Sequence, residues 1–273
     1  MRLEQSRIAV TGAASGIGQA LLRELAHYPV QIVAADIDGR RLADSAAAIP
    51  SAGDAKVTTF TGDMAIPEDV DALFDFAVDT MGGIDLFFAN AGFGYFEQIE
   101  QADWGHIASI YRTNVFAPIY AAEKMRELHP SSDYRVVITG SVMGRLALSN
   151  YTLYASTKAA LDRFAEGYRL EMGDHGQLTM VYPLAVRTDF FRVAGDPVIP
   201  WPSQPAAEVA RAVVQGIKND KETIYTSWIL PLMLLTLRLL PFTGRLYQRL
   251  DGPVVRRWLA RPRPDLEATE PSA

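Results

Sequence analysis

The sequence predicts a single α/β domain in which a doubly wound parallel sheet carries helices on both faces. Short apolar runs alternate with longer amphipathic stretches from Arg7 to about residue 182, the pattern of repeated strand–helix–strand units. No stretch in this range reads as a linker between two domains. The 273 residues, 49% of them hydrophobic, are enough for one large core.

Six short apolar runs are the predicted strands. They lie at residues 8–10, 31–35, 57–61, 86–89, 135–139 and 178–182. The amphipathic stretches between and after them are the predicted helices. These lie at residues 17–27, 39–48, 67–81, 104–128, 153–172 and 206–218.

Composition excludes several classes of protein. The formal net charge is -6 and no basic stripe interleaved with aromatic residues is present, so no nucleic-acid partner is expected. The absence of cysteine excludes disulfides and thiolate chemistry and suits a cytoplasmic location. The N-terminal residues do not form a signal peptide. No metal site is predicted, because the four histidines are scattered.

A glycine-rich turn follows the first predicted strand and opens the first helix. It runs from residue 11 to 18 and contains Gly12, Gly16 and Gly18. Glycine lets the backbone turn tightly and approach a pyrophosphate, and a helix N-terminus offers free N–H groups to its oxygens. This placement predicts a dinucleotide site.

Asp36 closes the second strand, where a carboxylate can accept hydrogen bonds from the adenosine ribose hydroxyls. It would also repel a 2'-phosphate, so the sequence favours NAD over NADP. Arg40 and Arg41 follow and could reach a 2'-phosphate if the loop folds back. NADP therefore stays as the alternative cofactor.

Tyr154 and Lys158 are four residues apart on one face of a predicted helix. An ammonium group near the phenol favours its ionised form, and a phenol tuned in this way can exchange a proton near neutral pH. Such pairs also occur on ordinary helix surfaces. The surrounding motifs must decide between the two interpretations.

Several separated motifs occur in the order that one family shows. The chain resembles the classical short-chain dehydrogenases/reductases (SDR family) over about residues 6–190, which implies a single-domain Rossmann fold. The resemblance implies catalytic roles for Asn114, Ser141, Tyr154 and Lys158. The residues that it implies as cofactor contacts are Gly12, Ser15, Gly16, Ile17, Gly18, Asp36, Asp63, Met64, Asn90, Gly92, Tyr154, Lys158, Pro183, Val186 and Thr188.

The resemblance also implies a mechanism. A hydride moves between the nicotinamide and the carbinol carbon while the Tyr154 hydroxyl exchanges the proton. Ser141 would bond the substrate oxygen, Lys158 the nicotinamide ribose, and Asn114 a water that leads to solvent. Leu184 departs from the family pattern, which commonly has glycine at this position. We expect its side chain to narrow the space beside the nicotinamide.

The C-terminal third is expected to cover the substrate. Residues 189–205 are aromatic and rich in proline, as in a lid. Residues 226–242 are almost entirely apolar, and the associated basic flank contains Arg238, Arg245, Arg249, Arg256 and Arg257. This segment could form a pocket wall or subunit interface, a peripheral membrane contact over about 226–257, or a spanning helix. The domain is expected to cover residues 1–260, with a disordered tail at 261–273.

These observations predict an NAD-dependent oxidoreductase that acts on a small lipophilic alcohol or ketone, with an apolar helical C-terminal extension. The alternatives are an NADP-dependent carbonyl reductase and a non-catalytic dinucleotide-binding sensor or scaffold. A homodimer or homotetramer is expected.

Overall fold

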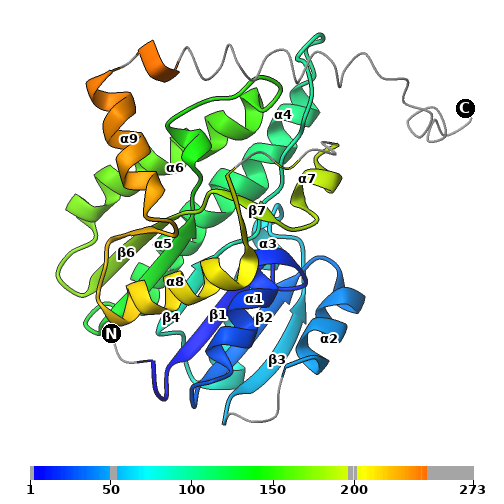
Figure 1. The fold of residues 1–273 in the computed structure, drawn as a ribbon. Coiled ribbons are helices and arrows are strands. Elements are labelled where there is room, and N and C mark those ends of the chain that lie inside the picture. The colour runs from blue at the N-terminus through cyan, green and yellow to red at the C-terminus, as the bar shows by residue number, and fades with distance from the viewer. Residues whose placement is uncertain (1–2, 50–53, 196–198, 200–201, 241, 245–273) are drawn as a thin grey trace, which may run out of the picture.

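The computed structural model describes residues 3–49, 54–195, 199, 202–240 and 242–244 (Figure 1). Its centre is a seven-stranded parallel sheet with the order β3-β2-β1-β4-β5-β6-β9. The strands are β1 Arg7–Thr11, β2 Gln31–Asp36, β3 Lys56–Thr61, β4 Leu86–Ala89, β5 Tyr134–Thr139, β6 Gly176–Tyr182 and β9 Thr223–Tyr225. The winding reverses between β1 and β4, so the doubly wound fold is confirmed.

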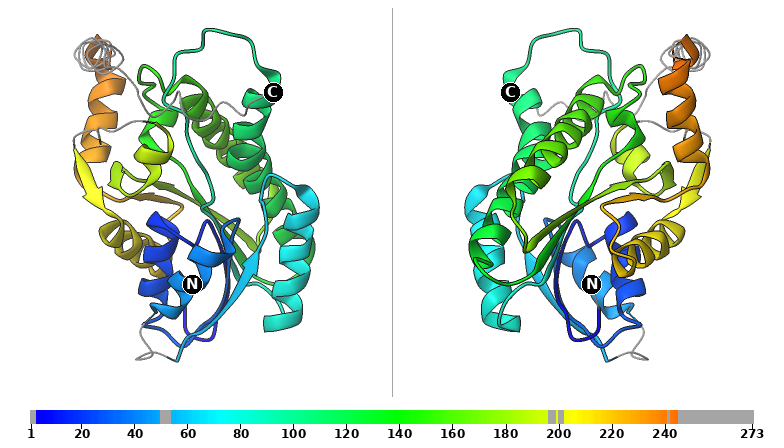
Figure 2. Two further views of the ribbon diagram at one scale, coloured as in Figure 1. Left: turned by 90° about the vertical axis from the view of Figure 1, so that its right-hand side faces the viewer. Right: turned by 90° about the vertical axis from the view of Figure 1, so that its left-hand side faces the viewer.

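Helices cover both faces of this sheet (Figure 2). On one face lie α1 Gly16–Leu25, α2 Gly39–Ala47 and α8 Ala206–Lys218, and on the other α3 Pro67–Met81, α4 Trp104–Tyr111, α5 Ala117–Leu128 and α6 Thr152–Glu171. Shorter elements follow the later strands. They are η1 Arg112–Phe116, η2 Val142–Gly144, β7 Ala185–Arg187, α7 Phe190–Val193, β8 Ser203–Pro205 and α9 Ile229–Leu239.

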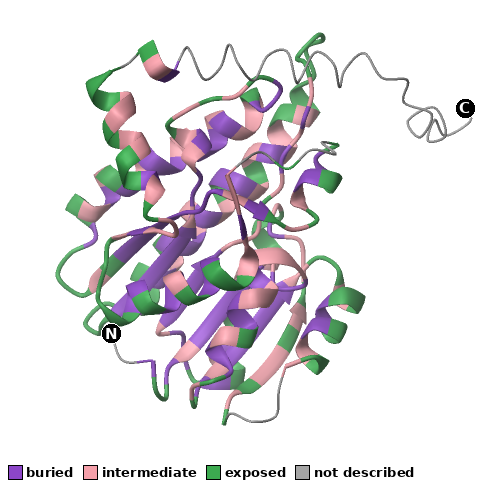
Figure 3. Ribbon diagram, viewed as in Figure 1, coloured by how far each residue is buried: buried purple, intermediate pink, exposed green. Residues whose placement is uncertain are grey.

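The sheet is buried between two apolar layers (Figure 3). Successive side chains of a strand point to opposite faces. In β1, Ile8 and Val10 therefore join the core under α1 and α8, while Ala9 joins the core under α3, α5 and α6. Burial on both faces explains why the strands read as continuous apolar runs.

The described elements agree with the predicted ones to within two residues, with three exceptions. The predicted helix 104–128 is interrupted by the π-helical η1. The prediction of six strands missed β9, which adds a seventh beside β6. The segment from Ala185 to Pro205 contains the small β7–β8 ladder and α7, where only a lid was predicted. Each missed element is five residues or fewer, too short to show a period.

The apolar C-terminal segment forms α9. Its Leu230 is fully buried, whereas Trp228 just before the helix is 80% exposed. Within the described ranges, no helix is both long and apolar enough to span a bilayer. Arg238 of the expected basic flank lies in the last turn of α9. Its other four arginines and the expected disordered tail at 261–273 lie outside the described residues.

Two helical glycines allow the packing between layers to be tested. A methyl group at Gly216 in α8 would lie 2.4 Å from Cδ1 of the buried Ile224, whereas Gly167 in α6 has no atom within 4 Å of that position. Gly216→Ala should lower the free energy of unfolding by about 1–2 kcal/mol through overpacking. Gly167→Ala, the matched control, should raise it by about 0.5–1 kcal/mol. Urea unfolding measures both, and equal effects of the two changes would contradict this packing.

Candidate active site

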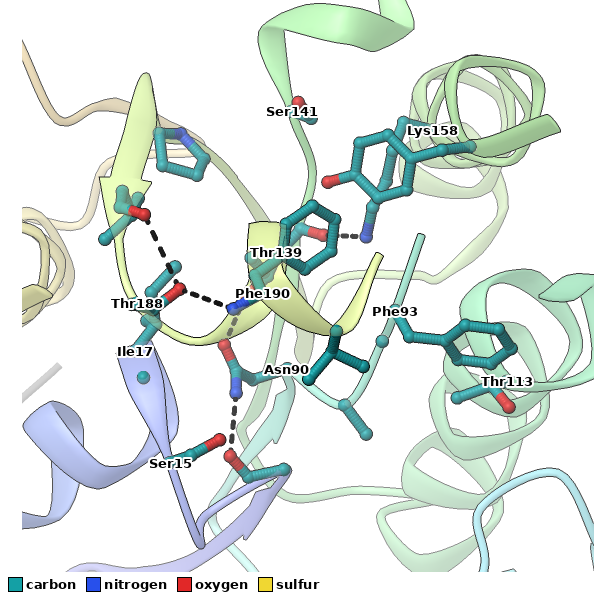
Figure 4. Close-up of a pocket in the computed structure, with 18 of the residues that line it drawn as sticks. Ser15, Ile17, Asn90, Phe93, Thr113, Thr139, Ser141, Lys158, Thr188 and Phe190 are labelled. Atoms are coloured by element: carbon teal, nitrogen blue, oxygen red, sulfur yellow. Dashed lines mark hydrogen bonds between the residues drawn. The ribbon is translucent and has the colours of Figure 1, made fainter. Parts of the chain in front are cut away.

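A cavity of about 580 Å³ opens at the carboxyl ends of the strands. It extends from the glycine-rich turn after β1 to the segment around α7, and Figure 4 shows part of its lining. Parallel α/β sheets bind their ligands at this edge, where the winding reverses. One continuous space therefore lies at the edge of the sheet where the functional residues are predicted.

The glycine-rich turn has room for backbone only. Gly12 and Gly16 have positive φ angles of 67° and 56°. A Cβ at Gly12 would lie 2.8 Å from Cα of Ala91, and one at Gly18 would lie 2.0 Å from the carbonyl oxygen of Gly12. Ser15 precedes α1 without capping it by a side-chain hydrogen bond, and Ser15, Gly16 and Ile17 at this helix start line the cavity. This cradle fits a pyrophosphate.

The predicted cofactor residues divide into two groups. Gly18 is absent from the described residues that line the cavity and instead lets α1 pack against the turn. The others line the cavity. They are Gly12, Ser15, Gly16, Ile17, Asp36, Asp63, Met64, Asn90, Gly92, Tyr154, Lys158, Pro183, Val186 and Thr188.

Asp36 lies at the end of β2, on the wall of the cavity. Its carboxylate accepts hydrogen bonds from the backbone N–H of Ala14, at 2.9 Å, and of Asp38, at 3.0 Å. Arg41 lines the same part of the cavity. Its guanidinium pairs with Asp189 at 2.9 Å, and its side chain is 47% exposed.

Asn90 joins the ends of three strands. Its side-chain amide donates to the carbonyl oxygens of Thr11 and Gly12, and its oxygen accepts from the Thr139 hydroxyl at 3.1 Å. These bonds fix the end of β4 between β1 and β5, at the point where the winding of the sheet reverses. Across the described ranges, no group of three His, Cys, Asp or Glu side chains could hold a metal ion.

Tyr154 and Lys158 project from the first turns of α6 into the cavity. Burial raises the pKa of Tyr154 to about 12, and a hydrogen bond with Ser141 offsets part of this effect. Burial lowers the pKa of Lys158 to about 8. Its ammonium donates to the carbonyl oxygen of Thr139 at 2.8 Å and lies 5.6 Å from the Tyr154 ring centre. Lys158 was expected to bring the pKa of the Tyr154 hydroxyl close to neutral pH. This expectation is wrong for the protein alone, because burial has the larger effect on that pKa.

Asn114 lies behind the cavity, not in its described lining. It is fully buried in η1. Its side-chain oxygen accepts from the N–H of Phe93 at 3.0 Å, and its amide donates to the Phe93 carbonyl and to Thr157. The side chain thus anchors the loop after β4. The structure brings Ser141, Tyr154 and Lys158 together in the cavity, and Asn114 supports them from outside it.

The wall opposite the glycine turn is apolar, and most of its residues were not singled out from the sequence. Phe190 packs on Tyr154 with 5.2 Å between ring centres. Met233 brings one face of α9 to the cavity, and Leu184 forms part of the wall with its side chain largely buried. The other apolar side chains on this wall include Phe93, Val142, Met143, Leu146, Leu148, Phe191 and Val193. The signals in the sequence were Leu184, the paired aromatics at 190–191 and the apolar segment 226–242 that contains Met233.

The fold and this cavity define a dinucleotide-binding α/β oxidoreductase. Residues 6–197 match the model of the short chain dehydrogenase family. The chain belongs to this family, and it is accordingly a nicotinamide-dependent oxidoreductase that transfers a hydride.

Relatives and solved structures agree with this assignment. The chain is 26% identical to a hydroxysteroid 11-beta-dehydrogenase 1-like protein of Danio rerio, over 82% of this chain and 79% of the relative. It is 29% identical to a 1-deoxy-11-beta-hydroxypentalenate dehydrogenase of Streptomyces exfoliatus, over 83% and 85% of the two chains. A short chain dehydrogenase/reductase from Burkholderia phymatum, solved with NAD, shares the fold with a TM-score of 0.77 at 23% identity, over 91% and 97% of the chains. One from Sphingobium yanoikuyae, solved with NADPH, gives 0.76 at 22% over 98% of both.

The lowered pKa of Lys158 predicts a stabilising substitution. Between about pH 8 and its ordinary pKa of 10.5, the folded protein binds fewer protons at this site than the unfolded chain. Keeping the buried ammonium charged below pH 8 therefore opposes folding by about 3 kcal/mol. Lys158→Met should raise the free energy of unfolding at pH 7 by about 1–3 kcal/mol, and this gain should shrink as the pH rises from 8 to 10.5.

Denaturant unfolding over this pH range measures the effect. Lys221→Met, at an exposed lysine, is the control and should show no comparable gain. A Lys158→Met protein that is less stable than the parent at pH 7 would contradict the inferred strain.

Proposed function

We propose that this chain is an NAD-dependent dehydrogenase or ketone reductase for a small hydrophobic alcohol or ketone, with Tyr154 as general acid and base. The observation that carries the proposal is the shared cavity. The Tyr154 hydroxyl, Ser141 and Lys158 open into the same space as the glycine cradle, and the side chains around α7 that line this space are mainly apolar. Relatives named as dehydrogenases of hydroxysteroids and of a hydroxypentalenate support a hydrophobic substrate.

The residues of the cradle and of the strand ends would hold the cofactor, which supplies or accepts the hydride when bound. In the reduction direction the Tyr154 hydroxyl gives its proton to the substrate oxygen. Its pKa near 12 keeps it protonated at neutral pH, as a proton donor must be. Ser141 donates a hydrogen bond to the same oxygen, and Lys158 stabilises the developing phenolate by its charge. Asn114 maintains the loop and the helix around this group.

Asp36 supports the choice of NAD, because its carboxylate would bond ribose hydroxyls and repel a 2'-phosphate. Arg41 favours the second candidate, an NADP-dependent carbonyl reductase, since this cation lines the same cavity as Asp36. The pairing of Arg41 with Asp189 neutralises this charge and weighs against that candidate. A sensor or scaffold without catalysis has no need of the buried Tyr154–Lys158 pair.

The assembly and location are part of the proposal. Trp104 and Phe116 are largely exposed on α4 and η1 and suit an interface in a homodimer or homotetramer. Peripheral membrane contact through about residues 226–257 is supported by the exposed Trp228, Leu235 and Leu239 on and next to α9. The protein is otherwise expected in the cytoplasm.

Replacement of Tyr154 by phenylalanine tests the chemistry. Tyr154→Phe should lower kcat at least about a thousandfold, because the proton donor is lost, while the affinity for the dinucleotide changes little. Steady-state turnover of lipophilic ketones and calorimetric binding of NADH provide the measurements. Tyr120→Phe, on α5 and not among the described residues that line the cavity, serves as the control with unchanged turnover. Substantial activity in purified Tyr154→Phe protein would overturn the proposed mechanism.

The cofactor preference is tested at Asp36. The ratio of kcat/KM with NAD to that with NADP should exceed one in the parent protein. Asp36→Asn keeps the shape of the side chain but removes the charge, so this ratio should fall at least about tenfold. A parent protein that uses NADP with the higher kcat/KM would establish the carbonyl reductase alternative instead.

A further inference from the structure

A closed group of polar side chains lies directly behind the Tyr154–Lys158 pair. Asp162 follows Lys158 by one turn of α6, and its side chain is 4% exposed. Its two oxygens meet the Nε of Arg145 at 3.1 Å and the hydroxyl of Tyr182 at 2.9 Å. Arg145 also donates to the Tyr182 hydroxyl at 2.9 Å and lies over its ring. The three side chains therefore bond one another in a triangle that joins α6, β6 and the turn after η2.

The same turn fixes Ser141. Its side chain caps η2 by accepting from the N–H of Met143 at 3.1 Å. Gly144, at the end of η2, lies so close to α6 that a Cβ there would be 2.9 Å from the carbonyl of Lys158. Arg145 then reaches Asp162 one turn further along the helix. Two successive residues thus hold the Ser141 turn in register with Lys158.

We propose that Arg145, Asp162 and Tyr182 are positioning residues, which hold the Ser141 turn on α6 and set the charge of Lys158 during the reaction. This inference rests on the function proposed above. The three residues act through Lys158 and Ser141, because none of them is among the described residues that line the cavity.

The electrostatic part of the argument depends on the groups around Lys158. In the described part of the chain, Lys158 lies by Tyr154 on α6, and Asp162 bonds Arg145 and Tyr182 on β6. Tyr225 on β9 contacts Arg145 from the far side of this group. Burial lowers the pKa of Lys158, and the Asp162 carboxylate acts against this lowering. Arg145 neutralises part of that carboxylate. Loss of Asp162 and loss of Arg145 should therefore shift the pKa of Lys158 in opposite directions.

Opposite shifts of the Lys158 pKa would distinguish a tuning role, in which these residues set the charge of Lys158, from a merely structural one. Asp162→Asn keeps the shape of the side chain, removes the negative charge and leaves Arg145 as an uncompensated cation. The pKa of Lys158 should fall by about one unit. Arg145→Met removes the cation and leaves the carboxylate to act on Lys158 alone, so the pKa should rise by about one unit. Tyr225→Phe, which loses only a 3.4 Å contact with Arg145, is the matched control and should leave it unchanged.

Two measurements on the full-length protein test these expected pKa shifts. NMR titration of ¹³C-labelled lysine, with the Lys158 signal assigned through Lys158→Arg, gives the pKa without any need for activity. The pH profile of kcat/KM for ketone reduction gives its effect on the reaction. Rates should decline as the pH rises through the pKa of Lys158. The midpoint of this decline should move to lower pH in Asp162→Asn and to higher pH in Arg145→Met.

The outcomes are distinct. Shifts of the Lys158 signal in opposite directions support the tuning role, and a pH profile that shifts with them supports its use in the reaction. Shifts in the same direction, or none, in folded variants would refute the proposal while leaving the function above intact. If Asp162→Asn does not fold, Arg145→Met still tests the proposal. A Lys158 pKa that does not rise in Arg145→Met would refute the tuning role. Absence of turnover in the parent protein, with lysine shifts as expected, would refute the proposed function instead.

Discussion

The hydrogen bond from the Lys158 ammonium to the Thr139 carbonyl oxygen connects the two halves of the proposed site. Thr139 ends β5, and its hydroxyl donates to Asn90 at the end of β4, which in turn bonds the glycine turn after β1. A single chain of hydrogen bonds therefore runs from α6 across the carboxyl edge of the sheet. Because a buried ammonium without an acceptor would be strongly destabilising, the bond to Thr139 favours a position of the first turns of α6 beside the end of β5.

The burial that creates the cavity also determines its chemistry. Enclosing Tyr154 raises its pKa and enclosing Lys158 lowers its pKa, so burial opposes the charged form of both groups, although Lys158 remains charged at neutral pH. Such strain is common at functional sites, where stability is exchanged for reactivity. The buried Asp162 carboxylate opposes this effect at Lys158. The proposed site is thus a balance between desolvation and a few charges placed one helical turn away.

The apolar C-terminal segment has two different surroundings. Met233 of α9 lines the cavity, and Leu230 packs in the core beside the sheet. Leu232, Leu235 and Leu239, in contrast, are more than half exposed. A helix that is apolar all round must cover something on each face. One face of α9 closes the cavity, and the outer face is the part that the proposed membrane contact would cover.

The sequence by itself determined the parallel sheet and its glycine turn, because periodicity and glycine placement are local properties. It also paired Tyr154 with Lys158, since residues four positions apart on a helix lie on the same face. Only the tertiary structure decided that Asn114 lies outside the cavity and that Arg41 lines it. It also joined Arg145 to Asp162 and Tyr182, which are 17 and 37 residues away along the chain. Contacts of this kind depend on how separate elements pack, and so do the pKa values that burial produces; neither leaves a pattern along the chain.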